Sequence, residues 1–184
     1  MWLKSSGGGG LLDIGVYLVG HAVLAYGTAQ PQVAAVGRLS EGGVDENAVV
    51  GLRYPSGSAA LTYGIDGHYT NEARIMCEKG YIALDCPQHS PTSARIVRAI
   101  SRTEASTQVV EEPLPVYPYH AGHCGGRRAC FPNSEGFVYE VREVERCLAA
   151  GLTESPEYTW EESLAVVRIM DGCRKQLGVV YDQD

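Results

Sequence analysis

The stretch GGGGLLDIGVYLVGHAVLAY, residues 7–26, carries the most regular pattern in this chain of 184 residues. Four consecutive glycines lead into a run whose side chains are apolar or absent, except at Asp13, Tyr17 and His21. This pattern predicts a helix over residues 11–26 that is buried on several sides and ends at Gly27. A glycine run without side chains can approach another domain or a ligand closely, or it can flex.

Asp13, Tyr17 and His21 are spaced by four residues. In an α-helix each step of four advances by about 40°, so all three side chains are expected on one face. Burying a carboxylate, a phenol and an imidazole without partners costs several kcal/mol. The three groups therefore either form hydrogen bonds with polar partners inside the core or face a solvent-filled cleft. The spacing alone leaves both interpretations open.

The middle of the chain has the pattern of short strands. Runs rich in Val, Ile, Tyr and Leu cover residues 33–39, 48–54, 58–65, 73–78 and 81–85, with two shorter candidates at 95–100 and 108–110. Tight turns such as Gly42-Gly43 and Lys79-Gly80 separate them, which predicts antiparallel hairpins. No helical pattern lies between these runs, and this excludes a parallel βαβ sheet in the region.

Two helices are expected near the end of the chain. The first has an apolar stripe with Ser134 as its N-cap and Gly151 as its end: Phe137, Val141, Val144 and Leu148. The second opens with a Thr-x-x-Glu capping box at Thr159–Glu162 and ends at Gly178, with the stripe Val166, Ile169, Met170, Cys173 and Leu177. We expect both stripes to pack on the sheet, so the fold class is α+β.

Composition excludes some classes of function. Fifteen Lys and Arg against 22 Asp and Glu give a net charge of −7, which argues against a basic nucleic-acid surface. Residues 11–26 are expected to be too short and too polar to span a membrane. No secretory signal is visible, so a cytoplasmic protein with reduced cysteines is expected. The long segment 111–133 holds His120, His123, Cys124 and Cys130, but their spacing is unlike common zinc sites, and we predict no metal.

The motif Gly-Gly-Gly-x-Leu-Asp-x-Gly-x-Tyr over residues 8–17 resembles the signature of the glucose–fructose oxidoreductase / inositol dehydrogenase / MocA-like family. The resemblance continues through residues 43–46, residues 71–75 with Lys79-Gly80, and residues 137–184. Within the family the sequence is most similar to the branch of dihydrodiol dehydrogenases and NADP-dependent D-xylose dehydrogenases. It departs from many relatives at Gly20, where they carry Asp, and in the segment 111–133, which looks like an insertion.

This resemblance implies a domain assignment. In the family an N-terminal Rossmann domain holds NAD or NADP, and a C-terminal α+β domain with an open, largely antiparallel sheet covered by helices completes the active site and forms dimers. Residues 1–184 look like that C-terminal domain alone, similar to the C-terminal domain of glyceraldehyde-3-phosphate dehydrogenase. The Rossmann fingerprint and a catalytic Lys of that half are absent from this sequence, so we expect a piece of a longer protein or a natural half-protein.

The resemblance also gives the polar face of the first helix a role. Oxidation of a sugar hemiacetal or cyclic diol sends a hydride to the nicotinamide and a proton to a base, and a phenol can bind or deprotonate the substrate oxygen. By this resemblance Tyr17 and Asp13 are catalytic, while His21 is assigned to substrate binding only because it faces the same way. The cofactor, NADP or NAD, would be held mainly by the other domain, through residues that this sequence does not identify.

Two hypotheses about function follow. In the first, the chain is the substrate-binding half of an NAD(P)-dependent dehydrogenase, inactive without a Rossmann domain. In the second, it is a non-catalytic dimerisation or regulatory module derived from such an enzyme. Both expect a homodimer formed through the sheet; the first adds a small-molecule substrate, and neither involves nucleic acid or a membrane.

Overall fold

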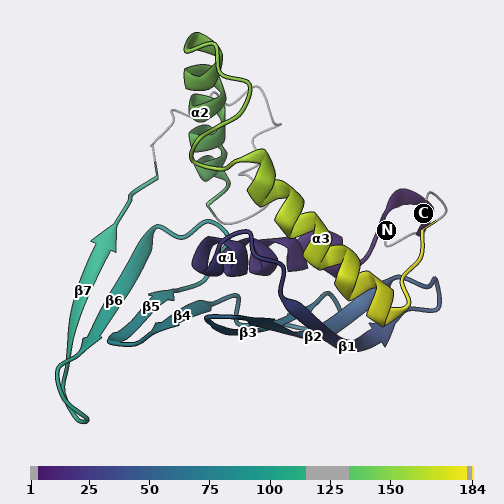
Figure 1. Ribbon diagram of the computed structural model, residues 1–184, viewed down its shortest axis with the longest axis horizontal. Coiled ribbons are helices and arrows are strands. Elements are labelled where there is room, and N and C mark those ends of the chain that lie inside the picture. The colour runs from purple at the N-terminus through teal and green to yellow at the C-terminus, as the bar shows by residue number, and fades with distance from the viewer. Residues whose placement is uncertain (1–3, 115–132, 182–183) are drawn as a thin grey trace, which may run out of the picture. The chain divides into compact units, whose positions relative to one another are not determined.

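The computed structural model describes residues 4–114, 133–181 and 184 (Figure 1). The chain separates into two compact units. Unit 1 consists of Met1–Tyr69 and Pro156–Asp184, and unit 2 of Thr70–Ser155. Each unit has its own antiparallel sheet, so each is described by itself.

Unit 1 is built on a three-stranded antiparallel sheet in the order β1-β2-β3. Its strands are β1 (Gln32–Leu39), β2 (Asp45–Tyr54) and β3 (Gly57–Gly64). Residues alternate between a buried and an exposed face, as a sheet covered on one side requires. Tight turns join the strands, and the one after β1 includes a hydrogen bond from the Gly43 amide to the Ser40 carbonyl at 2.9 Å.

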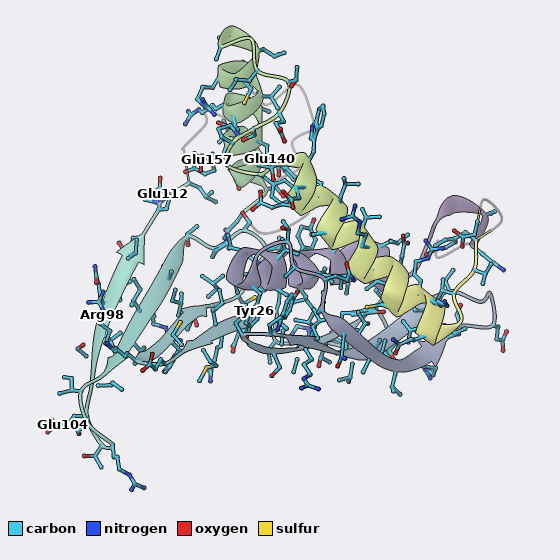
Figure 2. All side chains as sticks on the ribbon, viewed as in Figure 1. Tyr26, Arg98, Glu104, Glu112, Glu140 and Glu157 are labelled. Carbon is cyan, nitrogen blue, oxygen red and sulfur yellow. The ribbon has the colours of Figure 1, made fainter. Side chains whose placement is uncertain are left out.

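Two helices cover the buried face of this sheet, α1 (Val16–Tyr26) and α3 (Trp160–Leu177) (Figure 1). Helix α3 packs on β1, α1 packs on β3, and the two helices contact each other. The apolar side chains between these layers form the main core: Leu11, Val19, Ala22, Val23, Ala35, Ala48, Val50, Leu52, Tyr54, Tyr63, Ala165, Val166, Ile169, Met170 and Cys173. Tyr26, labelled in Figure 2, lies at the end of α1. Its ring stacks on that of Tyr54 with centroids 4.5 Å apart, and its hydroxyl donates a hydrogen bond to the Ser58 carbonyl at 2.9 Å.

Helix α3 has the ends and the buried stripe that its sequence predicts. The Thr159 hydroxyl accepts from the Glu162 amide, and the Glu162 carboxylate accepts from the Thr159 amide at 2.7 Å, which is a complete capping box. Gly178, with φ of +78°, ends the helix.

A side-chain amide of α3 also covers the open edge of the sheet. The Ala35 amide donates to Gln176 Oε1 at 2.9 Å, and Gln176 Nε2 donates to the Val33 carbonyl at 2.7 Å. Gln176 thus takes the place of a neighbouring strand at this point of β1, which removes two edge groups that would otherwise be available to another strand.

Unit 2 contains a four-stranded antiparallel sheet in the order β4-β5-β6-β7. Its strands are β4 (Ala73–Cys77), β5 (Gly80–Leu84), β6 (Ser93–Ala99) and β7 (Ala105–Glu111). The predicted hairpin at Lys79-Gly80 is confirmed, since Cys77 pairs with Gly80. Gly80 has φ of +147°, and a Cβ there would lie 1.9 Å from the Val97 carbonyl oxygen, so this turn requires glycine.

Helix α2 (Phe137–Ala149) of unit 2 corrects two expectations. Its predicted core stripe is exposed, from 55% at Val141 to 72% at Leu148. The predicted cap at Ser134 is also wrong, because a 3-10 turn, η3 (Ser134–Gly136), precedes the helix and Gly136 occupies the N-cap without a side-chain hydrogen bond. Helical spacing identifies an apolar face, but it does not say what covers that face.

The α+β class with open antiparallel sheets is confirmed, and all strand pairs in the described residues are antiparallel. Residues 11–26 were expected to be too short and too polar to span a membrane. The longer helical segment Lys4–Tyr26 is long and apolar enough to cross one by length and composition alone, which corrects that expectation. In unit 1, however, four apolar side chains of this segment lie in the core described above, Leu11, Val19, Ala22 and Val23, whereas Leu24 is exposed. Four described cysteines are free thiols, of which Cys147 and Cys173 are buried and Cys77 and Cys86 are exposed.

Candidate functional site

The predicted helix over residues 11–26 is present, but it begins with an irregular turn. Residues Leu11–Gly15 form a π-helical segment, η2, which continues directly into α1. Single π turns are rare and occur frequently at functional sites. Asp13 lies in this wider turn and Tyr17 in the regular helix that follows, so the angle between the two side chains is not the 40° of a uniform α-helix.

The structure leaves the predicted acid and phenol on the outer side of this helix. Asp13 is exposed and Tyr17 is 42% exposed, whereas Leu11, Gly15 and Val19 on the inner side are buried. His21 is half-buried. The polar face is therefore not sealed within the core of unit 1, and a carboxylate and a phenol stand about one helical turn apart on a surface that a small molecule can reach.

Beneath this helix lies a buried polar cluster that sequence reasoning did not identify. Asp45, the first residue of β2, is 0% exposed. Its Oδ2 accepts a hydrogen bond from the Leu11 amide at 2.6 Å and another from the Tyr63 hydroxyl at 2.8 Å. Burial and the hydrogen bond to Asp45 raise the pKa of Tyr63 well above its usual range, so its hydroxyl remains a donor. The cluster joins the start of η2 to strands β2 and β3.

The glycine run is explained by this cluster. Gly9 has φ of +129°, and a Cβ on it would lie 2.4 Å from Asp45 Oδ1. A Cβ on Gly10 would lie 2.9 Å from the Tyr63 ring. The Gly8 carbonyl accepts a hydrogen bond from the Tyr181 hydroxyl at 2.8 Å. The sequence left open whether the glycine run packs closely or flexes. In the structure Gly8–Gly10 pack closely, and they pack against the core of the chain itself.

One signal in the sequence pointed towards Asp45. It lies in the segment 43–46 that carries part of the family resemblance, and an acid preceded by Gly and Val at the start of a buried strand is unusual. Spacing could not connect it to Leu11, because 34 residues separate the two partners. Only the fold brings them together.

The described residues do not add a metal site to this helix face and the cluster beneath it. In residues 4–114, 133–181 and 184, no group of three or more His, Cys, Asp or Glu side chains is placed to hold a metal ion. The segment with His120, His123, Cys124 and Cys130 lies outside the described residues. The exposed phenol and carboxylate suit a hydroxylated substrate, and they do not by themselves form a nucleotide-binding site.

Comparison with known proteins finds a family with a similar sequence. Residues 1–83 match the family model of the GFO/IDH/MocA C-terminal domain. This match covers η2, α1 and the cluster around Asp45, and it confirms the family resemblance seen in the sequence. Over these residues the chain is similar to the C-terminal domain of the Gfo/Idh/MocA oxidoreductases.

The chain is also similar to trans-1,2-dihydrobenzene-1,2-diol dehydrogenases. It is 34% identical to the protein from Bos taurus over 179 residues and 32% identical to that from Homo sapiens over 183 residues. These matches cover 96% and 98% of this chain, but only 49% and 50% of the relatives. The chain thus spans about half the length of the curated relatives that it matches.

Solved structures share the fold. The 3-ketoreductase KijD10 from Actinomadura kijaniata, in complex with NADP and TDP-benzene, has a TM-score of 0.69 at 22% identity, over 96% of this chain and 49% of that one. The aldose-aldose oxidoreductase from Caulobacter crescentus, complexed with glycerol, has a TM-score of 0.67 at 19% identity, over 96% and 48%. At such identities the likeness supports the fold and not the substrate.

Proposed function

We propose that this chain is the substrate-binding half of an NADP-dependent oxidoreductase that oxidises a cyclic diol or a sugar hemiacetal. The observation that carries this proposal is the outer face of η2 and α1, where Asp13 and Tyr17 are exposed on a helix whose other side is in the core. The names of the similar dihydrodiol dehydrogenases and the NADP bound in the KijD10 complex support the class of substrate and cofactor.

Each residue on this face has a separate task in the proposal. Tyr17 binds the reacting oxygen and, as the general base of the oxidation, accepts its proton when the hydride leaves, while Asp13 binds a neighbouring hydroxyl or orients the phenol. His21, half-buried and one further turn along, contacts the distal part of the substrate. A nicotinamide cofactor held by the other domain would supply the acceptor for the hydride on the carbon that carries the reacting oxygen.

Catalysis needs a second domain in this proposal. Hydride transfer requires the reacting atoms to approach to about 3–3.5 Å, and this chain contributes only the substrate side of that geometry. We therefore expect the isolated chain to be inactive. Fusing it behind the half of the Bos taurus relative that it does not match should give a protein that reduces NADP with a trans-dihydrodiol or with D-xylose.

The residue assignments are tested in the same fusion. Tyr17→Phe should lower kcat by about 10²–10⁴-fold, the usual contribution of an acid–base group. Tyr158→Phe removes the hydroxyl of another exposed tyrosine in unit 1 and should leave kcat unchanged. Full activity of the Tyr17→Phe fusion would remove Tyr17 from the mechanism. His21→Ala should raise KM more than it lowers kcat, as expected for a residue that binds the substrate.

Gly20 offers a test of substrate choice. It lies one turn beyond Tyr17, and a Cβ built on it meets nothing within 4 Å, so a side chain can begin there without a clash at Cβ. Gly20→Asp adds a carboxylate that can accept hydrogen bonds from further hydroxyls. We expect this change to shift kcat/KM towards D-xylose and away from the dihydrodiol, and an unchanged ratio would place the substrate elsewhere.

A second candidate function is a dimerisation module, and the open face of the unit 1 sheet favours it. Val36 pairs with Val49, and both side chains are exposed, at 78% and 56%. The neighbouring row pairs Ala34 with Gly51, so the middle of this face carries small and apolar side chains. The rows on either side are polar, with Gln32 opposite Arg53 and Arg38 opposite Asn47. We propose that two copies of the chain meet there. A sedimentation measurement that finds a dimer, together with an inactive fusion, would favour the module over the enzyme.

A further inference from the structure

The carboxylate of Asp45 is an unusual feature of the core of unit 1. It is 0% exposed, and burial of an ionised group is costly unless hydrogen bonds and charges compensate. Its Oδ2 accepts two hydrogen bonds, from Leu11 and Tyr63, whereas Oδ1 has no hydrogen-bond partner within the described part of the chain. A residue kept at this cost is expected to do something that an apolar side chain could not.

The position of the Asp45 carboxylate at the start of η2 suggests its role. The N-cap of η2, Gly10, has no side chain to accept a hydrogen bond from the first amides of the helix. Asp45 supplies that acceptor from a distant strand, at the Leu11 amide. A negative charge at a helix N-terminus also interacts favourably with the helix dipole. Asp45 therefore caps a helix that lacks a cap of its own.

The cap lies immediately before the functional face. Leu11 is the first residue of the π turn, Asp13 is two residues later, and the Asp13 amide donates to the Gly9 carbonyl at 3.3 Å. The Tyr63 ring fills the space above Gly10 and Gly15, at the two ends of the same turn. The direction in which Asp13 leaves this turn, relative to Tyr17, thus depends on where the turn begins.

We propose that Asp45, acting with Tyr63, is a positioning residue for the Asp13–Tyr17 face. Its carboxylate holds the Leu11 amide, this contact sets the start of the π turn, and the turn sets the angle between the acid and the phenol. The catalytic meaning of this role rests on the proposed function, whereas the positioning itself is a property of the chain alone.

The test compares local and global effects in the 184-residue chain by amide hydrogen exchange and NMR. Asp45→Asn removes the charge at constant shape, and Tyr63→Phe removes one donor while keeping the ring. We expect the Leu11 amide to exchange about tenfold faster or more in Asp45→Asn, the size expected for the loss of a charge-assisted hydrogen bond, with a smaller change in Tyr63→Phe. The amide of Ile169, in the core of α3, should change much less.

The second readout is the ring resonances of Tyr17, which a purely stabilising role of Asp45 would not move. They should shift in both variants and stay in place in Tyr54→Phe. Tyr54 is the matched control because it is 4% exposed on β2 and its hydroxyl has no hydrogen-bond partner within the described residues.

Two outcomes would overturn the proposal. One is an equal increase in the hydrogen-exchange rates of the Leu11 and Ile169 amides. The other is that the ring resonances of Tyr17 do not shift in variants that keep the fold. If Asp45→Asn does not fold, Tyr63→Phe decides by the same two readouts. Failure of the proposed function would look different, since a fully active Tyr17→Phe fusion leaves these exchange and NMR results unaffected.

Discussion

Replacing Gly9 by Ala tests whether the glycine run is packed or merely flexible. Gly9 has φ of +129°, and an added Cβ would lie 2.4 Å from Asp45 Oδ1. Backbone strain of this kind costs about 1–3 kcal/mol. If Asp45 moves to relieve the contact, the charge-assisted hydrogen bond to the Leu11 amide is lost as well, at about 1.5–3 kcal/mol. We therefore expect Gly9→Ala to lower the free energy of unfolding by about 3 kcal/mol or more.

Gly20→Ala is the matched control. Gly20 lies in α1 without a positive φ, and a Cβ there meets nothing within 4 Å. The same chemical change should therefore stabilise the helix by about 0.5–1 kcal/mol, because Ala loses less conformational entropy than Gly. The two substitutions add the same methyl group within one segment and are expected to act in opposite directions.

The assay is urea unfolding followed by tryptophan fluorescence. The chain has two tryptophans, and a Trp2→Phe background leaves Trp160, at the start of α3, as the reporter of unit 1. A lower midpoint at an unchanged slope would show a change in stability alone. A Gly9→Ala midpoint equal to that of Gly20→Ala would refute the packing of the glycine run on Asp45 and would leave a flexible loop or a ligand contact as its role.

Three further predictions follow from other parts of the structure. Gln176→Ala removes two hydrogen bonds from the open edge of β1 and should cost about 1–2 kcal/mol in urea unfolding, and no loss would mean that water replaces the side chain fully. Val49→Asp places a charge on the open face of the unit 1 sheet and should convert the proposed dimer to a monomer in sedimentation, whereas Val141→Asp on α2 should not. The Arg146 guanidinium and the Ser155 hydroxyl hold the pKa of Glu143 down at about 2. The contribution of the Glu143 carboxylate to stability should therefore be complete above the ordinary Glu pKa near 4.5 and be lost as the pH falls towards 2. An NMR titration of this carboxyl group with a midpoint near 4.5 would contradict these contacts.

Local signals were enough to predict most of the secondary structure. Alternation and turn residues placed the hairpins, and the Thr159 capping box and Gly178 placed α3, because caps and turns involve residues close in sequence. The same kind of signal failed for α2. Its apolar stripe was correctly located, but burial depends on a partner element that periodicity cannot specify.

Some features of the candidate site could likewise be predicted from local sequence, whereas others could not. The sequence by itself determined that an acid and a phenol lie one turn apart on the opening helix, since helical spacing is a local property, and the Gly-rich motif indicated the family. Only the tertiary structure decided that this face is open, that the helix begins with a π turn, and that Asp45 caps it from 34 residues away. Burial and long-range hydrogen bonds depend on which segments the fold brings together, and no pattern within one segment contains that information.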